Sequence, residues 1–262
     1  MIESGMTALV TGASSGIGEV LARRFAARGL NVILVARSAG RLDALASELR
    51  TTHPAITTRT IAVDLSLPEA PECVLRELER TGSIVDVLAN NAGFGTHDPL
   101  AHEDPEVLAR EIQVNCGALV GLTTRLLPGM LARGRGGVLN VASTAAFQPT
   151  PTMAVYGATK AFVLSFTEAL WVETRGSGVR VVALCPGPTS TRFFESAGPG
   201  KEFLTRGRQT PEQVASVGLR AIETDGGPTV ISGMANRLLA SGYRIMPRGL
   251  MARMAERNVR SH

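Results

Sequence analysis

The chain has 262 residues, of which 44% are hydrophobic and 19% charged, a composition typical of a globular protein with a sizeable core. Its formal net charge of +4 comes from the C-terminal end, because residues 237–262 contain six arginines and one glutamate and the rest is nearly neutral. With only 4% aromatic residues and no other basic run, we expect no nucleic-acid partner.

Short aliphatic segments alternate with amphipathic ones along the chain. Strands are predicted at residues 8–11, 31–36, 60–63, 85–90, 137–143, 179–185 and 228–231. Helices are predicted at residues 15–28 and 41–50, after residue 68, from about residue 105, and at residues 156–175. Strands that are apolar on both faces and alternate with helices are typical of a parallel sheet covered on both sides. We therefore predict an α/β fold, doubly wound, in a single domain over residues 1–262, since no linker divides the chain.

The ends of the chain and its cysteines suggest a cytoplasmic protein. The first residues contain neither a basic nor an apolar targeting segment, and no apolar run reaches the roughly 18 residues of a membrane span. The three cysteines, Cys73, Cys116 and Cys185, have no metal-ligand spacing, so we expect reduced thiols packed in the core. His97 and His102 lack a third ligand nearby, and no metal site is predicted.

A glycine-rich turn follows the first predicted strand. Residues 11–18 read Thr-Gly-Ala-Ser-Ser-Gly-Ile-Gly and lead into the first predicted helix. Glycines allow a tight turn and a close approach to a pyrophosphate, which the N-terminus of the helix stabilises. The residues predicted to bind the phosphates are Gly12, Ser14, Ser15, Gly16, Ile17 and Gly18.

The end of the second predicted strand indicates which cofactor is bound. An NAD site has a carboxylate about 20 residues after the glycine turn, but this chain has Ala36 there, followed by Arg37 and Ser38. A guanidinium can hold a ribose 2′-phosphate through charge-assisted hydrogen bonds. We therefore predict NADP(H) as the cofactor, with Ser14, Ser15 and Ser38 as further donors. The alternative is that Arg37 is a solvated residue at a strand end.

Tyr156 and Lys160 are four residues apart in an apolar predicted helix, so both side chains lie on one face. The chain has only two tyrosines and two lysines, which makes this pairing informative. A phenol has a reference pKa of about 10, and a neighbouring ammonium favours the phenolate near neutral pH. The pair predicts Tyr156 as a proton donor and Lys160 as its partner.

Taken together, the motifs resemble those of the short-chain dehydrogenase/reductase family, in its NADP-preferring branch. They are residues 11–18, Asn90-Asn-Ala-Gly93, Ser143, Tyr156-x-x-x-Lys160 and Pro186-Gly187. They occur in the family's order over about residues 5–233. The resemblance implies a single-domain Rossmann fold with a seven-stranded parallel sheet and helices on both faces.

The resemblance also implies roles for individual residues. Tyr156 would protonate the developing alkoxide, Lys160 would lower the pKa of Tyr156 and bind the nicotinamide ribose, and Ser143 would hold the substrate oxygen. Asn115 would support a water relay to Lys160. Further implied cofactor contacts are Asp64 and Leu65 at the adenine, Asn91, Ala92 and Gly93 at the adenosine ribose, and Pro186, Gly187, Thr189 and Thr191 at the nicotinamide carboxamide. Each of these residues could instead have a purely structural role. Asn90 and Asn91, for example, could simply tie strand ends together.

Residues 234–262 form a basic extension where many members of this family have a short tail that helps to build a tetramer. We still expect a homo-oligomer, either a dimer or a tetramer. Leu250, Met251 and Met254 alternate with arginines in a short amphipathic pattern, which raises the hypothesis of contact with an anionic membrane surface. We prefer a solvated helix packed on its own body, because the apolar face is short.

The segment 187–210 is too long for an ordinary connection and contains three phenylalanines, and long loops of this kind are often active-site lids. With Phe94 and Phe147 it favours an apolar substrate pocket, although these rings could equally serve only to anchor the loop.

The predicted function is an NADP(H)-dependent oxidoreductase that interconverts a hydrophobic ketone or aldehyde and its alcohol by hydride transfer, with Tyr156 as general acid/base. The expected partner is therefore a small-molecule carbonyl or alcohol substrate. One alternative is a 3-oxoacyl reductase for carrier-linked or CoA-linked acyl chains. Another is a non-catalytic NADP(H)-binding sensor or scaffold.

Overall fold

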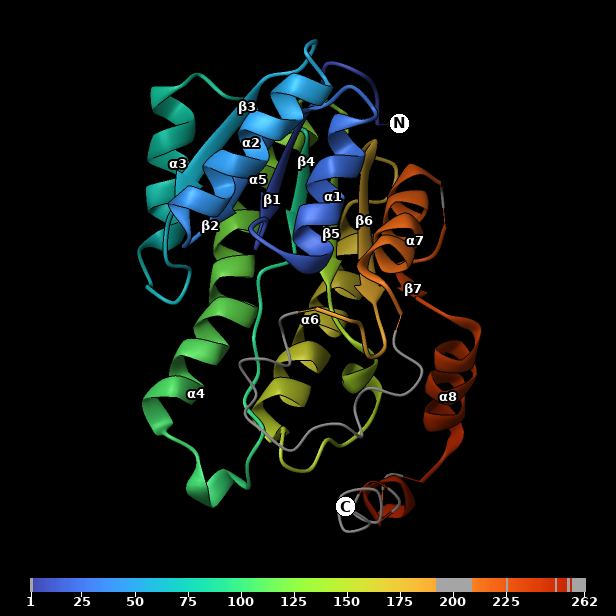
Figure 1. The fold of residues 1–262 in the computed structure, drawn as a ribbon. Helices are drawn as coiled ribbons and strands as arrows, with labels where there is room; N and C mark the ends of the chain where they lie inside the picture. The colour runs from blue at the N-terminus through green and yellow to red at the C-terminus, as the bar shows by residue number, and fades with distance from the viewer. Residues whose placement is uncertain (1, 192–208, 225, 248, 254, 256–262) are drawn as a thin grey trace.

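The computed structural model describes residues 2–191, 209–224, 226–247, 249–253 and 255. Within them the chain forms a seven-stranded sheet in the order β3-β2-β1-β4-β5-β6-β7, and all neighbouring strands are parallel. The strands are β1 (Thr7–Thr11), β2 (Asn31–Ala36), β3 (Thr58–Ala62), β4 (Val87–Asn90), β5 (Gly136–Val141), β6 (Val179–Cys185) and β7 (Thr229–Ile231). The predicted doubly wound, single-domain Rossmann fold is confirmed (Figure 1).

The helices alternate with these strands. They are α1 (Gly16–Ala26), α2 (Ala39–Thr52), α3 (Ala70–Arg80), α4 (Pro105–Ile112), α5 (Ala118–Ala132), α6 (Ala154–Glu173), α7 (Pro211–Glu223) and α8 (Met234–Ile245). Two short 3-10 helices, η1 (Leu100–His102) and η3 (Thr144–Phe147), lie in loops, and a π-helical turn, η2 (Gln113–Gly117), joins α4 to α5. The long helix predicted from residue 105 is this continuous unit of α4, η2 and α5. The sequence analysis named neither α7 nor α8.

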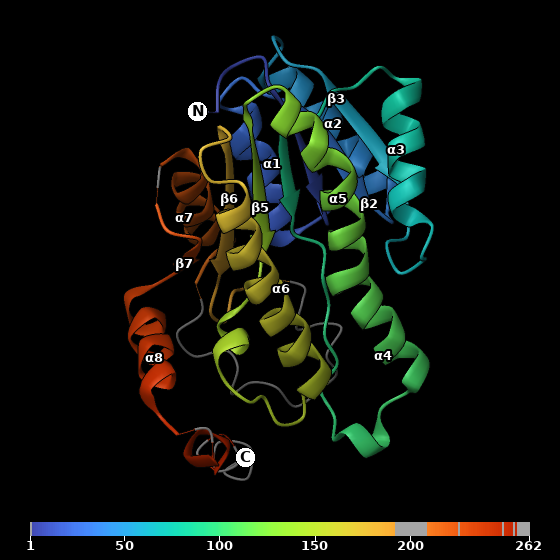
Figure 2. The same cartoon turned by 180° about the vertical axis from the view of Figure 1, so that it is seen from behind.

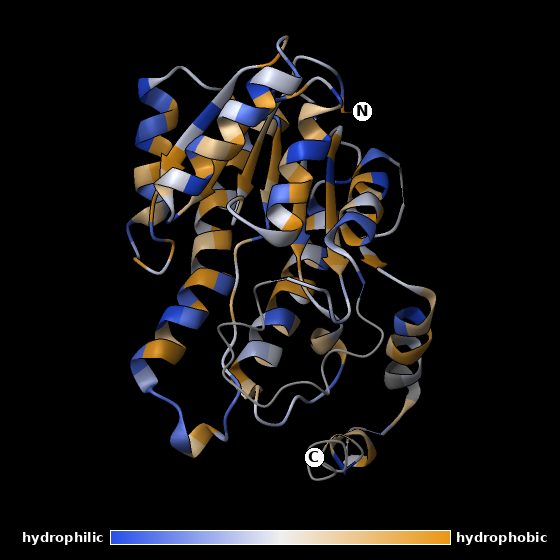
Figure 3. Cartoon of the chain, in the orientation of Figure 1, coloured by the Kyte–Doolittle hydropathy of each residue, from blue (hydrophilic) through white to orange (hydrophobic). Residues whose placement is uncertain are grey.

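Helices cover both faces of the sheet (Figures 1 and 2). On one face, Phe25 of α1, Leu42 of α2 and Leu219 of α7 pack in one core cluster. Leu122 of α5 and Leu170 of α6 pack with residues of α3 in a second cluster on the other face. Strands that pack on both sides are rich in apolar side chains, and Figure 3 shows the central strands mostly in the hydrophobic colour, whereas the edge strand β3 is partly hydrophilic.

The strand order reverses between β1 and β4, since β2 and β3 follow on one side and β5 to β7 on the other. Open α/β sheets bind ligands at the carboxyl ends of the strands beside such a reversal. The predicted site residues follow four strands: the glycine turn follows β1, Asn91 follows β4, Ser143 lies just beyond β5 and Pro186 follows β6. The topology therefore brings these motifs to one edge of the sheet.

The C-terminal extension begins by packing on the body of the protein. Helix α8 contacts β7 and η3, Ala240 is buried, and the Asn236 side-chain amide donates to the Ser232 carbonyl at 2.7 Å. Leu238 and Leu239 are nevertheless exposed. Met251 is buried, whereas Met254 lies outside the described residues. Contact with a membrane surface stays a prediction, as does the extent of the domain over residues 1–262.

Two observations bear on the predictions from composition. All three cysteines are free. Only Cys185 is buried, so the expected core packing is wrong for Cys73 and Cys116, which are half-buried because α3 and η2 leave part of each side chain open to solvent. In the part of the chain that the structure describes, we find no helix that is both long and apolar enough to cross a membrane.

Candidate functional site

The glycine turn between β1 and α1 leaves no room for larger side chains. Gly12 has φ 66° and Gly16 has φ 59°, in the left-handed region that favours glycine. A Cβ on Gly18 would overlap the Asn91 side-chain amide and the Gly12 carbonyl. Ser15 caps α1 without a side-chain capping bond to any described residue. Because the first N–H groups of a helix have no intrahelical partner, this turn fits a phosphate group.

Residues 91–93 are tied directly to the glycine turn. The Thr11 hydroxyl accepts from the backbone N–H groups of Asn91 (2.9 Å) and Ala92 (3.0 Å), and the Asn91 side-chain amide donates to the Thr11 carbonyl at 2.9 Å. A Cβ on Gly93 would lie 3.2 Å from Nζ of Lys160. The segment therefore connects the glycine turn with the Tyr156–Lys160 pair.

Asn90 has a different role, as a buried structural tie. Its side-chain amide donates to the Thr123 hydroxyl at 3.0 Å and to Oδ1 of Asn140 at 2.9 Å. Asn140 in turn donates to the Thr167 hydroxyl at 3.0 Å. The network links β4 and β5 to α5 and α6, which agrees with the structural alternative for this asparagine.

The ends of β2 and β3 place the residues predicted for the adenosine end of the cofactor near one another. Arg37 is exposed, and the Ser38 side chain forms no capping bond with a described residue at the start of α2. Asp64 accepts a hydrogen bond from the Ser66 N–H at 3.0 Å. This bond is the main cause that lowers the pKa of Asp64, and the nearby Arg37 charge lowers it further. Leu65 is buried beside them.

Tyr156 lies in the first turn of α6 and hydrogen-bonds the side chain of Ser143, which follows β5. The Ser143 hydroxyl also accepts from the Ala145 N–H at 3.1 Å. Burial raises the pKa of Tyr156 to about 12, and the Ser143 bond opposes this rise. The ammonium was expected to lower this pKa, but desolvation of the phenolate dominates. Tyr156 is thus held as a phenol, the form that can donate a proton.

Lys160 lies on the same side of α6 as Tyr156. Its Nζ is 5.7 Å from the centre of the Tyr156 ring and donates to the Val141 carbonyl at 2.9 Å. The residue is only 4% exposed, and burial lowers the pKa of its ammonium to about 8. At pH 7 it is still mainly charged, so a cation stands beside the phenol.

Asn115 occupies the π-helical turn η2, a local widening that is frequent at functional sites. Its side chain exchanges two hydrogen bonds with the Phe94 backbone, at 3.1 Å and 2.9 Å. It also donates to the Thr159 hydroxyl at 3.0 Å. Asn115 therefore joins the loop after β4 to α6, while its part in a water relay stays a prediction.

The segment after β6 reaches the glycine turn. A Cβ on Gly16 would lie 3.0 Å from Cγ2 of Thr191, and the Pro186 carbonyl accepts from the Thr144 N–H at 2.9 Å. The Thr189 hydroxyl donates to the Gly187 carbonyl at 2.9 Å. The implied nicotinamide segment therefore lies between the glycine turn and η3.

The two ends of the segment 187–210 meet. The Gln209 N–H donates to the Pro188 carbonyl, and the Ser190 N–H donates to the Gln209 carbonyl, both at 2.9 Å. The predicted lid residues Phe193, Phe194 and Phe203 lie outside the described residues.

The sequence analysis missed one titratable residue beside the site. Glu111, at the end of α4, is fully buried, and burial raises the pKa of its carboxyl to about 7. Its position four residues before Asn115 on one continuous helix is the signal that could have revealed it.

Comparisons with known proteins give a consistent result. The family model described as short chain dehydrogenase matches residues 6–202. A very-long-chain 3-oxoacyl-CoA reductase of Macaca fascicularis is 32% identical over 221 residues, which cover 83% of this chain and 70% of the relative.

Solved structures are similar over nearly the whole chain. A short-chain dehydrogenase from Sphingobium yanoikuyae in complex with NADPH superposes with a TM-score of 0.81 at 33% identity, and the match covers 94% of this chain and 95% of that one. A structure that addresses 7beta-hydroxysteroid dehydrogenase stereoselectivity has a TM-score of 0.87 at 28% identity, with 97% and 98% covered.

Proposed function

The chain belongs to the short-chain dehydrogenase/reductase family, and we propose that it uses NADP(H) to interconvert a hydrophobic ketone or aldehyde and its alcohol. As a member of this family it is an oxidoreductase of CH–OH groups with a nicotinamide cofactor, and the sensor alternative is not retained. The observation that carries the proposal is the hydrogen bond between Tyr156 and Ser143, with the buried ammonium of Lys160 beside the ring.

The residues present fit an NADP(H) molecule. The glycine turn packs closely on Asn91 and Thr191. Ser15 makes no side-chain capping bond with a described residue at the start of α1, so the first N–H groups of this helix favour a phosphate. At the end of β2, Ala36 offers no carboxylate to repel a 2′-phosphate, and Arg37 is exposed and available to bind it. The NADPH complex of the Sphingobium relative supports the same choice. When bound, the cofactor supplies the hydride.

Around this cofactor each group of residues has a proposed contact. The phosphates would be held by Gly12, Ser14, Ser15, Gly16, Ile17 and Gly18, the 2′-phosphate by Arg37 and Ser38, the adenosine by Asp64, Leu65, Asn91, Ala92 and Gly93, and the nicotinamide end by Tyr156, Lys160, Pro186, Gly187, Thr189 and Thr191.

The protein's own groups would manage the proton. Ser143 and Tyr156 hydrogen-bond each other, so their hydroxyls are close enough for one substrate carbonyl oxygen to replace this bond. That oxygen would accept from both hydroxyls and be polarised by two donors. Tyr156 then donates its proton to that oxygen as the alcohol forms. The Lys160 ammonium stabilises the phenolate that remains, because an opposite charge nearby favours the ionised form. In the reverse direction Tyr156 accepts the proton.

A hydrophobic substrate is supported by the relatives and by nearby aromatic residues. The similar proteins include a very-long-chain 3-oxoacyl-CoA reductase and a 7beta-hydroxysteroid dehydrogenase, whose names specify a long acyl chain and a steroid. Phe94 and Phe147 are half-buried in the loops that follow β4 and β5. The first relative also favours the second candidate function, a 3-oxoacyl reductase acting on CoA-linked or carrier-linked chains.

The test is NADPH consumption with free ketones of increasing chain length and with 3-oxoacyl-CoA esters of matching length. Tyr156→Phe is the control and should lower kcat roughly 100- to 10,000-fold while NADPH binding is kept. Rates that rise with chain length for free ketones support the proposal, and rates confined to the CoA esters select the second candidate. Tight NADPH binding without turnover of any carbonyl contradicts both.

We also propose that the protein is cytoplasmic and forms a homo-oligomer. Exposed apolar side chains, which monomers rarely group together, occur at Ile112 of α4, Leu131 of α5, and Phe162 and Val172 of α6. These three helices lie on one side of the molecule (Figure 2). This side is the surface through which we expect a second copy to bind.

A further inference from the structure

Glu111 is a buried carboxyl for which the proposed reaction has no role. It is 0% exposed. Its Oε2 accepts from the Thr96 N–H at 3.2 Å and from the Thr96 hydroxyl at 3.4 Å, while Oε1 has no hydrogen-bond partner among the described residues. Burying an acid without full hydrogen bonding is costly, so such a residue needs an explanation.

The geometry connects Glu111 to the catalytic pair. Glu111 and Asn115 are four residues apart on the continuous helix of α4 and η2 and therefore project on one side. They hold Thr96 and Phe94, two residues apart in the loop after β4. Gly93, next in that loop, lies against Asn115 and Lys160. The two helix side chains thus fasten one stretch of backbone directly beside the site.

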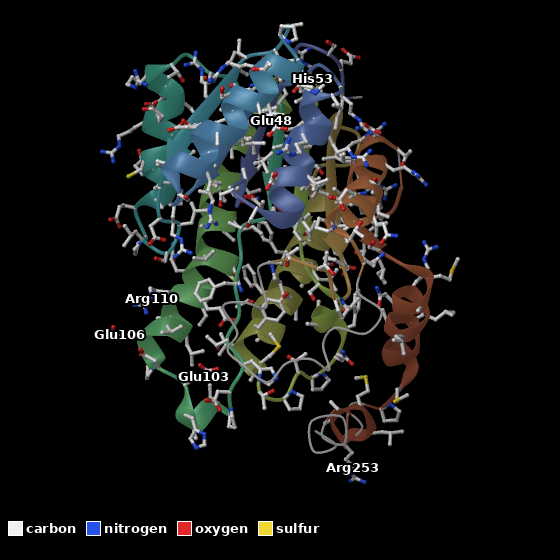
Figure 4. All side chains as sticks on the ribbon, in the orientation of Figure 1. Glu48, His53, Glu103, Glu106, Arg110 and Arg253 are labelled. Atoms are coloured by element: carbon white, nitrogen blue, oxygen red, sulfur yellow. The ribbon has the colours of Figure 1, made fainter. Side chains whose placement is uncertain are left out.

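Titratable groups face Glu111 from three sides. They are Tyr156 and Lys160 on α6, Cys116 in η2, and Glu103 in the segment before α4. Figure 4 labels Glu103 and, on α4, the exposed residues Glu106 and Arg110. Lys160 is also faced by the thiols of Cys116 and Cys185, which raise its pKa. The negative charge of Glu111 adds to this effect and also raises the pKa of Tyr156. An ionised Glu111 therefore opposes proton loss from either group.

We propose that Glu111 is a positioning residue of the reductase, whose buried carboxylate keeps Tyr156 and Lys160 in their protonated forms and fixes the loop after β4 through Thr96. The inference rests on the proposed function, because it matters for catalysis only if Tyr156 is the proton donor. Its consequence is that carbonyl reduction continues to a higher pH than the Tyr–Lys pair alone would allow.

The first test is the pH profile of kcat for reduction by Glu111→Gln. Glutamine keeps the shape and an oxygen that accepts from Thr96, but it carries no charge. Without the carboxylate the first proton leaves the coupled pair at a lower pH, so the alkaline limb should move down by about one pH unit. Near pH 6 the wild-type carboxyl is itself mostly protonated, so the two kcat values there should agree within about twofold.

The matched control is Glu106→Gln, on the same helix, whose side chain is 86% exposed. This variant should keep the wild-type profile, because solvent screens an exposed charge. A purely structural role for Glu111 would lower kcat by the same factor at every pH and leave the alkaline limb in place, which would overturn the proposal.

The second test does not depend on turnover. The chain has only two lysines, so Lys201→Arg leaves Lys160 as the single lysine signal in an NMR pH titration. Glu111→Gln in this background should lower the Lys160 midpoint by about one pH unit. An unchanged midpoint overturns the inference even if the enzyme is active. A lowered midpoint without turnover of any carbonyl supports the electrostatic role and rejects the proposed function alone.

Discussion

At the scale of single residues, Arg37 is the exposed residue proposed to bind the 2′-phosphate of NADP(H). It follows β2 at a point where the chain has no carboxylate, and its charge already acts on Asp64 at the end of β3. A hydrogen bond to a charged group contributes about 1.5–3 kcal/mol. The discrimination between NADPH and NADH should therefore depend largely on this guanidinium.

Arg37→Ala should raise the KM for NADPH roughly 10- to 100-fold and leave the KM for NADH unchanged, because only NADPH has the 2′-phosphate. Steady-state kinetics with both cofactors measures this. Arg41→Ala, an exposed arginine of α2, is the control and should change neither value. Equal effects of Arg37→Ala on both cofactors would show that Arg37 does not contact the 2′-phosphate.

At the scale of elements, the packing of α1 against the segment after β4 positions the glycine turn. Gly18 faces the Asn91 side chain and the Gly12 carbonyl, without space for a Cβ. Gly40 in α2 has no atom within 4 Å of an added Cβ. Close packing therefore requires a glycine at position 18, whereas nothing in the packing requires a glycine at position 40.

Gly18→Ala should lower the free energy of unfolding by about 1–3 kcal/mol, because the new methyl group must displace backbone. Gly40→Ala should raise it by up to about 1 kcal/mol, since alanine is the better helix former. Urea unfolding of both variants measures the difference. A Gly18→Ala protein as stable as wild type would mean that α1 moves easily relative to Asn91.

At the scale of the whole molecule, the buried groups make stability depend on pH. The pKa of Glu111 is raised from 4.5 to about 7, so between these values the folded protein keeps a proton that the unfolded chain has lost. Stability contributed by this group therefore falls as pH rises through that window. Lys160, whose pKa is lowered from 10.5 to about 8, acts oppositely: the unfolded chain holds its proton longer, and stability rises across that range.

Glu111→Gln should remove the first of these effects. Relative to wild type, the variant should gain on the order of 3 kcal/mol of unfolding free energy between about pH 4.5 and pH 7. Urea denaturation of both proteins at several pH values measures this gain. The contributions of the other carboxyl groups cancel when the unfolding free energy of wild type is subtracted from that of the variant. A constant offset between the two curves would mean that Glu111 titrates normally in the folded protein.

The sequence alone determined the features that depend on local patterns. The apolar strands, the glycine turn and the spacing of Tyr156 and Lys160 are visible within a few residues, because backbone periodicity and helix geometry are local properties. The strands accordingly lie within about two residues of their predicted positions.

Only the tertiary structure decided how the polar groups are buried and partnered. Glu111 meets Thr96 across 15 residues, and Asn90 meets Asn140 across 50, distances that no local pattern spans. The same packing reversed the expected direction of the Tyr156 pKa, because the desolvation that raises it comes from residues far apart in the sequence. The local motifs thus identified the reacting groups, while long-range packing set their protonation states and supplied Glu111 beside them.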